Sequence, residues 1–164
     1  MSDEQWPEMA ERFLKAHANP VAGFDAALGE LKAGRKEGHW IWYIFPQLEG
    51  LGTSSAAQWF ALADVDQAWA FASHVVLGAH LLQAIETVNQ HPGTLHDLMV
   101  NPVDVRKLVS SLTLFWYVCQ DHMHDREVSH ATRASELTAA CYRVLKKAAD
   151  QGIPQCAFTI QALA

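Results

Sequence analysis

Apolar residues recur at spacings of three and four along most of the chain, which is the period of an α-helix that buries one face. Leu77, Leu81 and Ile85 are a clear example and predict a helix over about residues 76–90. An alternation of period two, typical of a half-buried strand, never extends beyond a few residues. The pattern therefore predicts an all-α protein.

Proline, glycine and capping residues divide the helical pattern into segments. Asp64 with Gln67, and Thr94 with Asp97, have the spacing of capping boxes and predict two helix starts. No linker, repeat or low-complexity tract interrupts the chain, so residues 1–164 are expected to form one compact domain of about six to eight helices. The expected helices cover about residues 7–17, 21–33, 55–62, 65–72, 76–90, 94–101, 103–119 and 132–150, the last with Tyr142 facing inward, and the apolar tail from Cys156 is expected to dock on the core.

The helical pattern breaks after the second expected helix, in residues 34–54. This segment contains two tryptophans, a tyrosine, a phenylalanine, a histidine, four glycines and Pro46. Glycine loosens the backbone and proline removes a hydrogen-bond donor, so an irregular loop is predicted. A loop this aromatic either plugs the core or lines a concavity. If the segment is extended, Trp40 and Trp42 point to opposite sides, so that one packs in the core while the other lines a pocket.

Composition and charge exclude several classes of protein. The chain has 164 residues, half of them apolar, and a formal net charge of −6. Its basic residues cluster only in pairs, Arg35-Lys36 and Lys146-Lys147, so nucleic acid is not an expected partner. No run reaches the ~18 to 20 apolar residues that span a bilayer, and the acidic start is unlike a signal peptide. We therefore expect a cytoplasmic protein with no membrane partner.

The cysteines and histidines raise the question of a metal site. The three cysteines are widely spaced and odd in number, which in a reducing compartment predicts buried free thiols with no catalytic role. Cys119, His122 and His124, with His130 nearby, match no zinc motif, because a second cysteine pair or a glutamate is missing. No phosphate-binding loop, dinucleotide fingerprint or nucleophile elbow is present. We expect neither a metal nor a cofactor.

Residues 104–113 form a second unusual segment. In a helix, Asp104, Lys107 and Ser111 share one face, and Ser110 and Thr113 form an adjacent polar strip. These polar groups can line a pocket. Alternatively, Asp104 complements the helix dipole and pairs with Lys107 at the surface, while the hydroxyl groups bond back to the helix.

Two polar residues stand within the aromatic segment. His39 either meets a ligand or is satisfied by backbone carbonyls. Gln47 follows Pro46 in an apolar run, and a buried amide needs partners, which a structural network or a ligand can supply.

The two segments together resemble the bacterial domain-of-unknown-function family 1810. That resemblance implies a small, single-domain, mainly α-helical protein and carries no established activity. Some relatives bear the label calpastatin, but inhibitors of that name are long disordered repeats, whereas this chain is compact and apolar. The chain departs from the family where an aspartate is expected three residues before Thr159 and Cys156 stands instead. The motifs that carry the resemblance are Gly34-Arg35-Lys36, His39-Trp40, Trp42, Phe45-Pro46-Gln47-Leu48, Gly50-Leu51-Gly52 and Ser54, followed by Asp104, Lys107-Leu108, Ser110-Ser111 and Thr113-Leu114-Phe115.

Three functions fit these residues. The first is a pocket between residues 39–47 and 104–113 for a small polar or anionic, nucleotide-like ligand. The second uses the same pocket to hydrolyse an ADP-ribose-like glycosidic bond, by analogy of layout with ADP-ribose-processing glycosidases. Asp104 would activate water and His39 would donate a proton, although only one of the two usual carboxylates is visible. The third is a structural or interaction protein with no pocket. The candidate ligand-binding residues are Arg35, Lys36, His39, Trp40, Trp42, Gln47, Asp104, Lys107, Ser110, Ser111 and Thr113.

Overall fold

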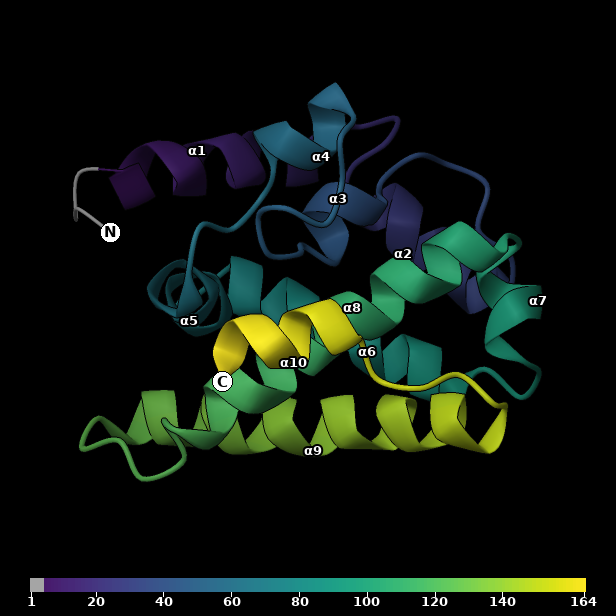
Figure 1. Cartoon of the computed structure of the whole chain (residues 1–164). Coiled ribbons are helices and arrows are strands. Elements are labelled where there is room, and N and C mark those ends of the chain that lie inside the picture. Colours follow the sequence, from purple (N-terminus) through teal and green to yellow (C-terminus); the bar gives the residue numbers. More distant parts are fainter. Residues whose placement is uncertain (1–4) are drawn as a thin grey trace.

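The computed structural model describes residues 5–164, and this part of the chain contains ten helices and no strand (Figure 1). The prediction of an all-α fold is confirmed. Three of the helices, α3, α4 and α7, have five residues or fewer, so seven longer helices form the framework. The helices are α1 (Gln5–His17), α2 (Phe24–Ala33), α3 (Ile41–Ile44), α4 (Ser55–Trp59), α5 (Val65–Ser73), α6 (Leu77–Gln90), α7 (Leu95–Met99), α8 (Pro102–Gln120), α9 (Val128–Asp150) and α10 (Ala157–Leu163).

Helix α8 is the centre of the fold. It packs against α9, α5, α10, α7 and α3, and Figure 1 shows it between α9 on one side and α1 with α4 on the other. Twelve of its residues are buried, so it has neighbours on most of its surface instead of a single buried stripe. Four of the twelve are polar: Asp104, Ser110, Ser111 and Thr113. Their polar atoms must find partners inside the protein.

The predicted helix starts at Asp64 and Thr94 are confirmed. Asp64 Oδ1 accepts a hydrogen bond from the Gln67 N–H at 3.0 Å, and Thr94 Oγ1 accepts one from the Asp97 N–H at 3.0 Å. The Gln67 side chain reaches back to the Ala63 N–H at 2.8 Å. These contacts satisfy N–H groups that a helix leaves without partners in its first turn.

Several predicted boundaries were wrong by a few residues. The second helix begins at Phe24 instead of Val21, because Asn19 Oδ1 accepts hydrogen bonds from the Val21 and Ala22 N–H groups and holds them in a turn. The last long helix begins four residues early, at Val128. The tail docks on α8 as α10, which confirms that it packs on the core.

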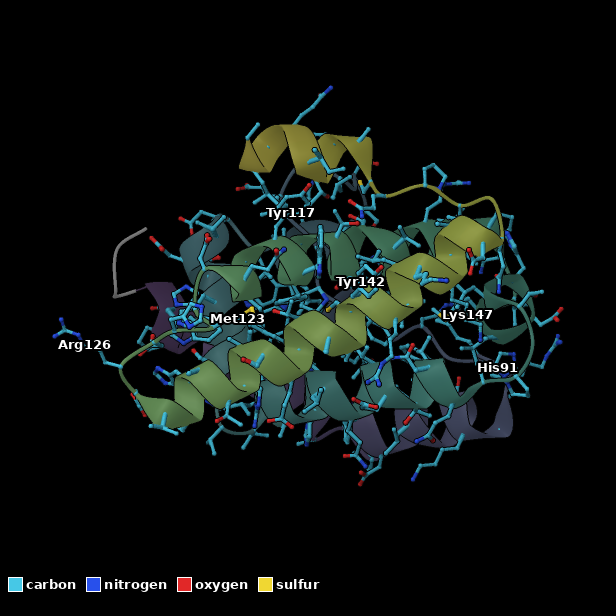
Figure 2. All side chains as sticks on the ribbon, turned by 90° about the horizontal axis from the view of Figure 1, so that it is seen from below. His91, Tyr117, Met123, Arg126, Tyr142 and Lys147 are labelled. Atoms are coloured by element: carbon cyan, nitrogen blue, oxygen red, sulfur yellow. The ribbon has the colours of Figure 1, made fainter. Side chains whose placement is uncertain are left out.

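Tyr142 does not face inward as predicted. Its side chain is 53% exposed. The buried stripe of α9 instead runs through Leu137, Cys141 and Leu145. Tyr142 follows Cys141, and one residue along a helix turns the side chain by about 100°, so Tyr142 points away from the stripe. In Figure 2, Tyr142 and Tyr117 are labelled on the side of the molecule where α9 and α10 lie.

The aromatic segment is partly helical, so the prediction of a wholly irregular loop was wrong at its centre. Ile41–Ile44 form the single turn α3, and Trp40 is the residue before it. The predicted extended alternation of Trp40 and Trp42 therefore does not occur. Trp40 is completely buried, whereas Trp42 is only partly buried. The end of the segment is fixed by a bridge between Leu48 and Leu62.

The two ends of α9 are held differently. At its C-terminal end the Lys147 ammonium donates to the His91 carbonyl, and burial lowers the pKa of Lys147 (Figure 2). Before the other end, in the turn that leads from α8 to α9, the imidazole of His122 stacks on Trp69 with ring centroids 3.8 Å apart. The turn between α8 and α9 is thus anchored on α5 at this histidine.

No single helix in residues 5–164 has both the length and the apolarity to cross a membrane. Helices α5 and α6, bent by 85° at their junction, meet both criteria only when they are counted together.

Candidate functional site

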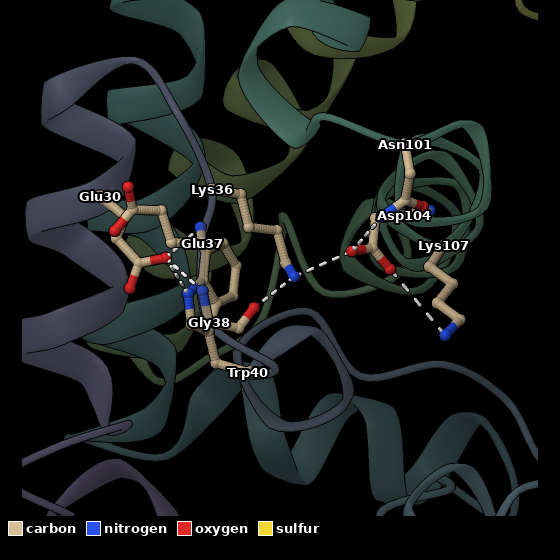
Figure 3. A network of polar contacts seen from close by, with 8 residues as sticks. All are labelled: Glu30, Lys36, Glu37, Gly38, Trp40, Asn101, Asp104 and Lys107. Atoms are coloured by element: carbon tan, nitrogen blue, oxygen red, sulfur yellow. Dashed lines mark hydrogen bonds and ion pairs between the residues drawn. The ribbon is translucent and has the colours of Figure 1, made fainter.

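A buried ion pair joins the aromatic segment to the first turn of α8. Lys36 Nζ lies 2.8 Å from Asp104 Oδ2, and the two side chains are only 5% and 11% exposed. The Lys36 ammonium also donates to the Gly38 carbonyl (Figure 3). The backbone N–H of Lys36 donates to Leu98 O at 2.7 Å. Buried charges are stable only when they are paired and hydrogen-bonded, so the ion pair fixes the segment against α8. The backbone hydrogen bond to Leu98 fixes it against α7.

The position of Asp104 depends on the residues that begin α8. Asn101 caps the helix, because its Oδ1 accepts from the Asp104 N–H at 2.8 Å, and its Nδ2 donates to Asp104 Oδ2 at 3.2 Å. Val100, immediately before the cap, has φ 76° and ψ −44°. A β-branched residue at positive φ is strained, and such strain persists only where the surrounding structure imposes it. The strain at Val100 is associated with placing Asn101 and Asp104 against Lys36.

Glu30 of α2 organises the beginning of the aromatic segment. Its Oε1 accepts hydrogen bonds from the N–H groups of Glu37 and Gly38 and from Trp40 Nε1, the last at 3.1 Å (Figure 3). Burial alone would raise the pKa of Glu30, but these donors, with the nearby Lys36 charge, hold it below its usual value. The carboxylate thereby stabilises the tight path of residues 37–40.

A second ammonium approaches Asp104 from the other side. Lys107 Nζ lies 3.9 Å from Asp104 Oδ1 and 4.7 Å from the centre of the Trp42 ring. Gln47 Nε2 donates to the Lys107 carbonyl at 3.2 Å, which ties the end of the aromatic segment to the same turn of α8. Two ammonium groups thus approach one carboxylate, and Lys107 is the more distant and the more exposed of the two.

Two buried polar atoms beside this cluster have no hydrogen-bond partner among the described residues. They are Trp42 Nε1 and Ser111 Oγ. Ser111 lies one helical turn beyond Lys107 on the same face of α8, and Trp42 lies under the Lys107 ammonium. Leaving a buried polar group unpaired costs about 1–3 kcal/mol, and such groups are rare in folded proteins.

Comparison with known proteins identifies the family. The family model described as "Protein of unknown function (DUF1810)" matches residues 7–141. The chain belongs to the DUF1810 family. This DUF1810 protein is similar to the conserved hypothetical protein Rv1873 from Mycobacterium tuberculosis, with 31% sequence identity, 94% of this chain and 96% of that chain covered, and a TM-score of 0.72. No curated protein matches the sequence.

The matched residues contain both segments that form the cluster in this DUF1810 protein, whereas Cys156 and α10 lie beyond them. Of the candidate residues, the structure brings six together between the aromatic segment and α8. We call this region the loop–helix seam. It comprises Lys36, Trp42, Gln47, Asp104, Lys107 and Ser111.

The remaining candidates lie outside the seam. Arg35 and His39 are exposed, and no hydrogen bond or ion pair joins His39 to Asp104 within residues 5–164. Trp40 is fully buried, with its indole N–H given to Glu30. Ser110 and Thr113 face α10 instead. Ser110 Oγ lies 3.3 Å from Thr159 Oγ1, and Thr113 Oγ1 donates to Val109 O, in the back-bonding arrangement that the sequence left open.

Sequence reasoning missed three residues that shape the site: Glu30, Val100 and Asn101. Asn101 carries a recognisable signal, because Asn before Pro102 with an acidic residue at position 104 is a typical helix start. Glu30 and Val100 carry no local signal, since their roles depend on segments folded against them. Within the described residues, no group of three histidines, cysteines or acidic residues is arranged to hold a metal ion.

Proposed function

We propose that this DUF1810 protein binds a small nucleotide-like anion at the loop–helix seam. The observation that carries the proposal is the pair of buried polar atoms, Trp42 Nε1 and Ser111 Oγ, which have no protein partner in the described residues next to two ammonium groups that share one carboxylate. A phosphate offers acceptor oxygens for both atoms and a negative charge for Lys107.

Lys107 is the cation best suited to meet a ligand. The inner oxygen of Asp104 is already paired with Lys36 at 2.8 Å, whereas Lys107 lies 3.9 Å from the outer one. Its side chain is 23% exposed, against 5% for Lys36, so it can turn toward solvent at lower cost. Turning toward a phosphate also frees the face of the Trp42 ring, on which a planar base can stack.

Hydrolysis of an ADP-ribose-like bond has less support than binding. A carboxylate that activates water must be free to accept a proton, but Asp104 is engaged by Lys36 and by Asn101 Nδ2. The proposed proton donor, His39, is exposed, and no hydrogen bond or ion pair joins it to Asp104 in the described residues. The seam therefore has groups that suit binding, but it has no aligned acid and base for hydrolysis.

A structural role is favoured for the inner part of the seam by one observation. Lys36 and Asp104 are buried against each other, with side chains only 5% and 11% exposed, and none of five concavities on the described surface is lined by a residue of the seam. We therefore assign the inner pair to holding the fold. Ligand binding falls to the outer residues Trp42, Gln47 and Lys107, because these three are partly exposed.

A thermal-shift titration tests the proposal. The wild-type protein is heated with AMP, ADP or ADP-ribose, and a ligand at about 100 times its dissociation constant stabilises it by about 2.7 kcal/mol. Lys107→Met is expected to abolish the shift. Lys146→Met, which removes an exposed ammonium of α9 that is paired with Asp150, is the matched control and keeps the shift. No shift with any of the three nucleotides, or an equal shift in Lys107→Met, would contradict the proposal.

A further inference from the structure

A separate apolar pocket lies on another face of α8. It has a volume of about 460 Å³ and lies between the first turns of α8 and the linker that leads from α9 to α10. Figure 1 shows this linker as the yellow trace that leaves the C-terminal end of α9 and returns to α10. Its walls are mainly apolar and come from Pro102, Val105, Val109, Ile153 and Pro154. The volume is within the usual range for small-molecule sites.

The path of the linker is fixed where it leaves α9. Gly152, just after α9, has φ +81°, a left-handed conformation that favours glycine. The Ile153 N–H then donates to Ala148 O at 2.8 Å, so the linker turns away from the helix axis. A Cβ atom built on Gly152 would meet no heavy atom within 4 Å, which shows how little protein fills this corner.

A single permanent charge lines the pocket. Arg106 is exposed, and it has no ion pair or hydrogen bond to any residue in the described part of the chain. No aspartate or glutamate lines the pocket, and the other polar side chains there are His96, Gln155 and Cys156. An apolar cavity with one free guanidinium is complementary to a molecule with an apolar body and one anionic end.

We propose that this pocket binds a small amphipathic carboxylate. The apolar chain lies against Val105, Val109 and Ile153, and the carboxylate pairs with the Arg106 guanidinium through two parallel hydrogen bonds. This site is independent of the loop–helix seam. Val105 and Val109 lie on a different face of α8 from Lys107 and Ser111, so the failure of either proposal leaves the other standing.

Cys156 provides a built-in reporter of occupancy, because it lines the pocket and is partly exposed. Burial alone would raise the pKa of its thiol, but hydrogen bonds from Thr159, Ser110 and the Phe158 backbone lower it below the usual value. The other two cysteines are buried, and burial raises the pKa of Cys119 to about 12 and that of Cys141 well above its usual value. Alkylation at neutral pH therefore reports selectively on Cys156.

The test uses the full-length chain, with decanoate as the probe below its micellar concentration. Binding is measured by calorimetry, and the rate of Cys156 alkylation by iodoacetamide is measured by intact mass. Decanoate is expected to bind and to slow alkylation about tenfold at saturation. Each methylene removed should weaken binding about fourfold, since burial of one such group stabilises by about 0.8 kcal/mol, so octanoate binds about 16-fold more weakly.

Matched variants separate the charge from the cavity. Arg106→Met should weaken decanoate binding about tenfold, whereas Arg126→Met, in the exposed turn between α8 and α9, should leave it unchanged. Ala157→Phe fills the pocket from an exposed position and should abolish both binding and protection, while Ala149→Phe on the exposed side of α9 should abolish neither. Absence of decanoate binding to the wild type, or binding that Arg106→Met and Ala157→Phe both leave unchanged, would overturn the proposal.

Discussion

The buried histidine of α1 makes the protein sensitive to acid. His17 lies against α3 and α6, with Nε2 2.7 Å from the Tyr43 carbonyl and Nδ1 2.9 Å from His80 Nδ1. The carbonyl only accepts, so Nε2 carries the proton of the neutral ring and Nδ1 accepts from His80. A second proton on His17 would point at the His80 N–H. Burial is the largest cause that lowers the pKa of His17, from 6.5 to about 4. The hydrogen bond to the Tyr43 carbonyl raises this pKa, and the repulsion from His80 lowers it further.

The sign and size of the effect follow from this pKa. The unfolded chain binds a proton at His17 below pH 6.5, and the folded protein does so only below about pH 4. The contribution of neutral His17 to stability is therefore complete above pH 6.5 and is lost as the pH falls toward 4. The difference between the two pKa values corresponds to about 3 kcal/mol of unfolding free energy, and most of this is already lost at pH 4.5.

Urea unfolding followed by circular dichroism between pH 7 and pH 4.5 measures this loss. In His17→Gln, where the amide can still donate to the Tyr43 carbonyl, the decrease in unfolding free energy over that range should be smaller by about 2.5 kcal/mol. His124→Gln replaces an exposed histidine and should show the wild-type decrease. If His17→Gln loses stability in parallel with the wild type, His17 is not the group that is responsible.

Three further predictions concern the site and its supports. Trp40→Ala should lower the unfolding free energy by about 3–5 kcal/mol because Trp40 is fully buried, whereas Trp42→Ala should cost clearly less; equal losses in chemical denaturation would contradict this difference. Val100→Gly should leave the melting temperature unchanged or raise it, since relief of about 1–3 kcal/mol of backbone strain offsets the roughly 1 kcal/mol that glycine costs through the unfolded chain; a fall of more than about 4 °C would contradict strain at this position. Lys36→Met should destabilise by about 3–5 kcal/mol by leaving Asp104 buried and unpaired, and adding Asp104→Leu should restore much of that loss; additive losses in a double-mutant cycle would refute the coupling.

The helices could be predicted from the sequence because their signals are local. The stripe of Leu77, Leu81 and Ile85 and the capping pairs at Asp64 and Thr94 each specify an element within a few residues. The turn Ile41–Ile44 could not be predicted, because one helical turn is too short to show a period and its stability comes from packing on α1, α6 and α8.

The candidate site was predictable only along α8. Helical spacing placed Asp104, Lys107 and Ser111 on one face, as the structure has them. The partner of Asp104 is Lys36, far away in the chain, and no spacing rule relates the two residues. Cys156 was expected to be buried; it is partly exposed and lines a pocket, because the linker before α10 arches over α8.

The indole N–H of Trp42 gives the most direct test of the loop–helix seam. In the ¹⁵N-labelled protein each of the six tryptophans gives an indole N–H signal, and the loss of one signal in Trp42→Phe and of another in Trp40→Phe assigns these two. The account predicts that titration with AMP, ADP or ADP-ribose moves the Trp42 signal downfield, as a new hydrogen bond forms, while Trp40, already bonded to Glu30, stays in place. An unmoved Trp42 signal at millimolar concentrations of all three nucleotides would contradict it.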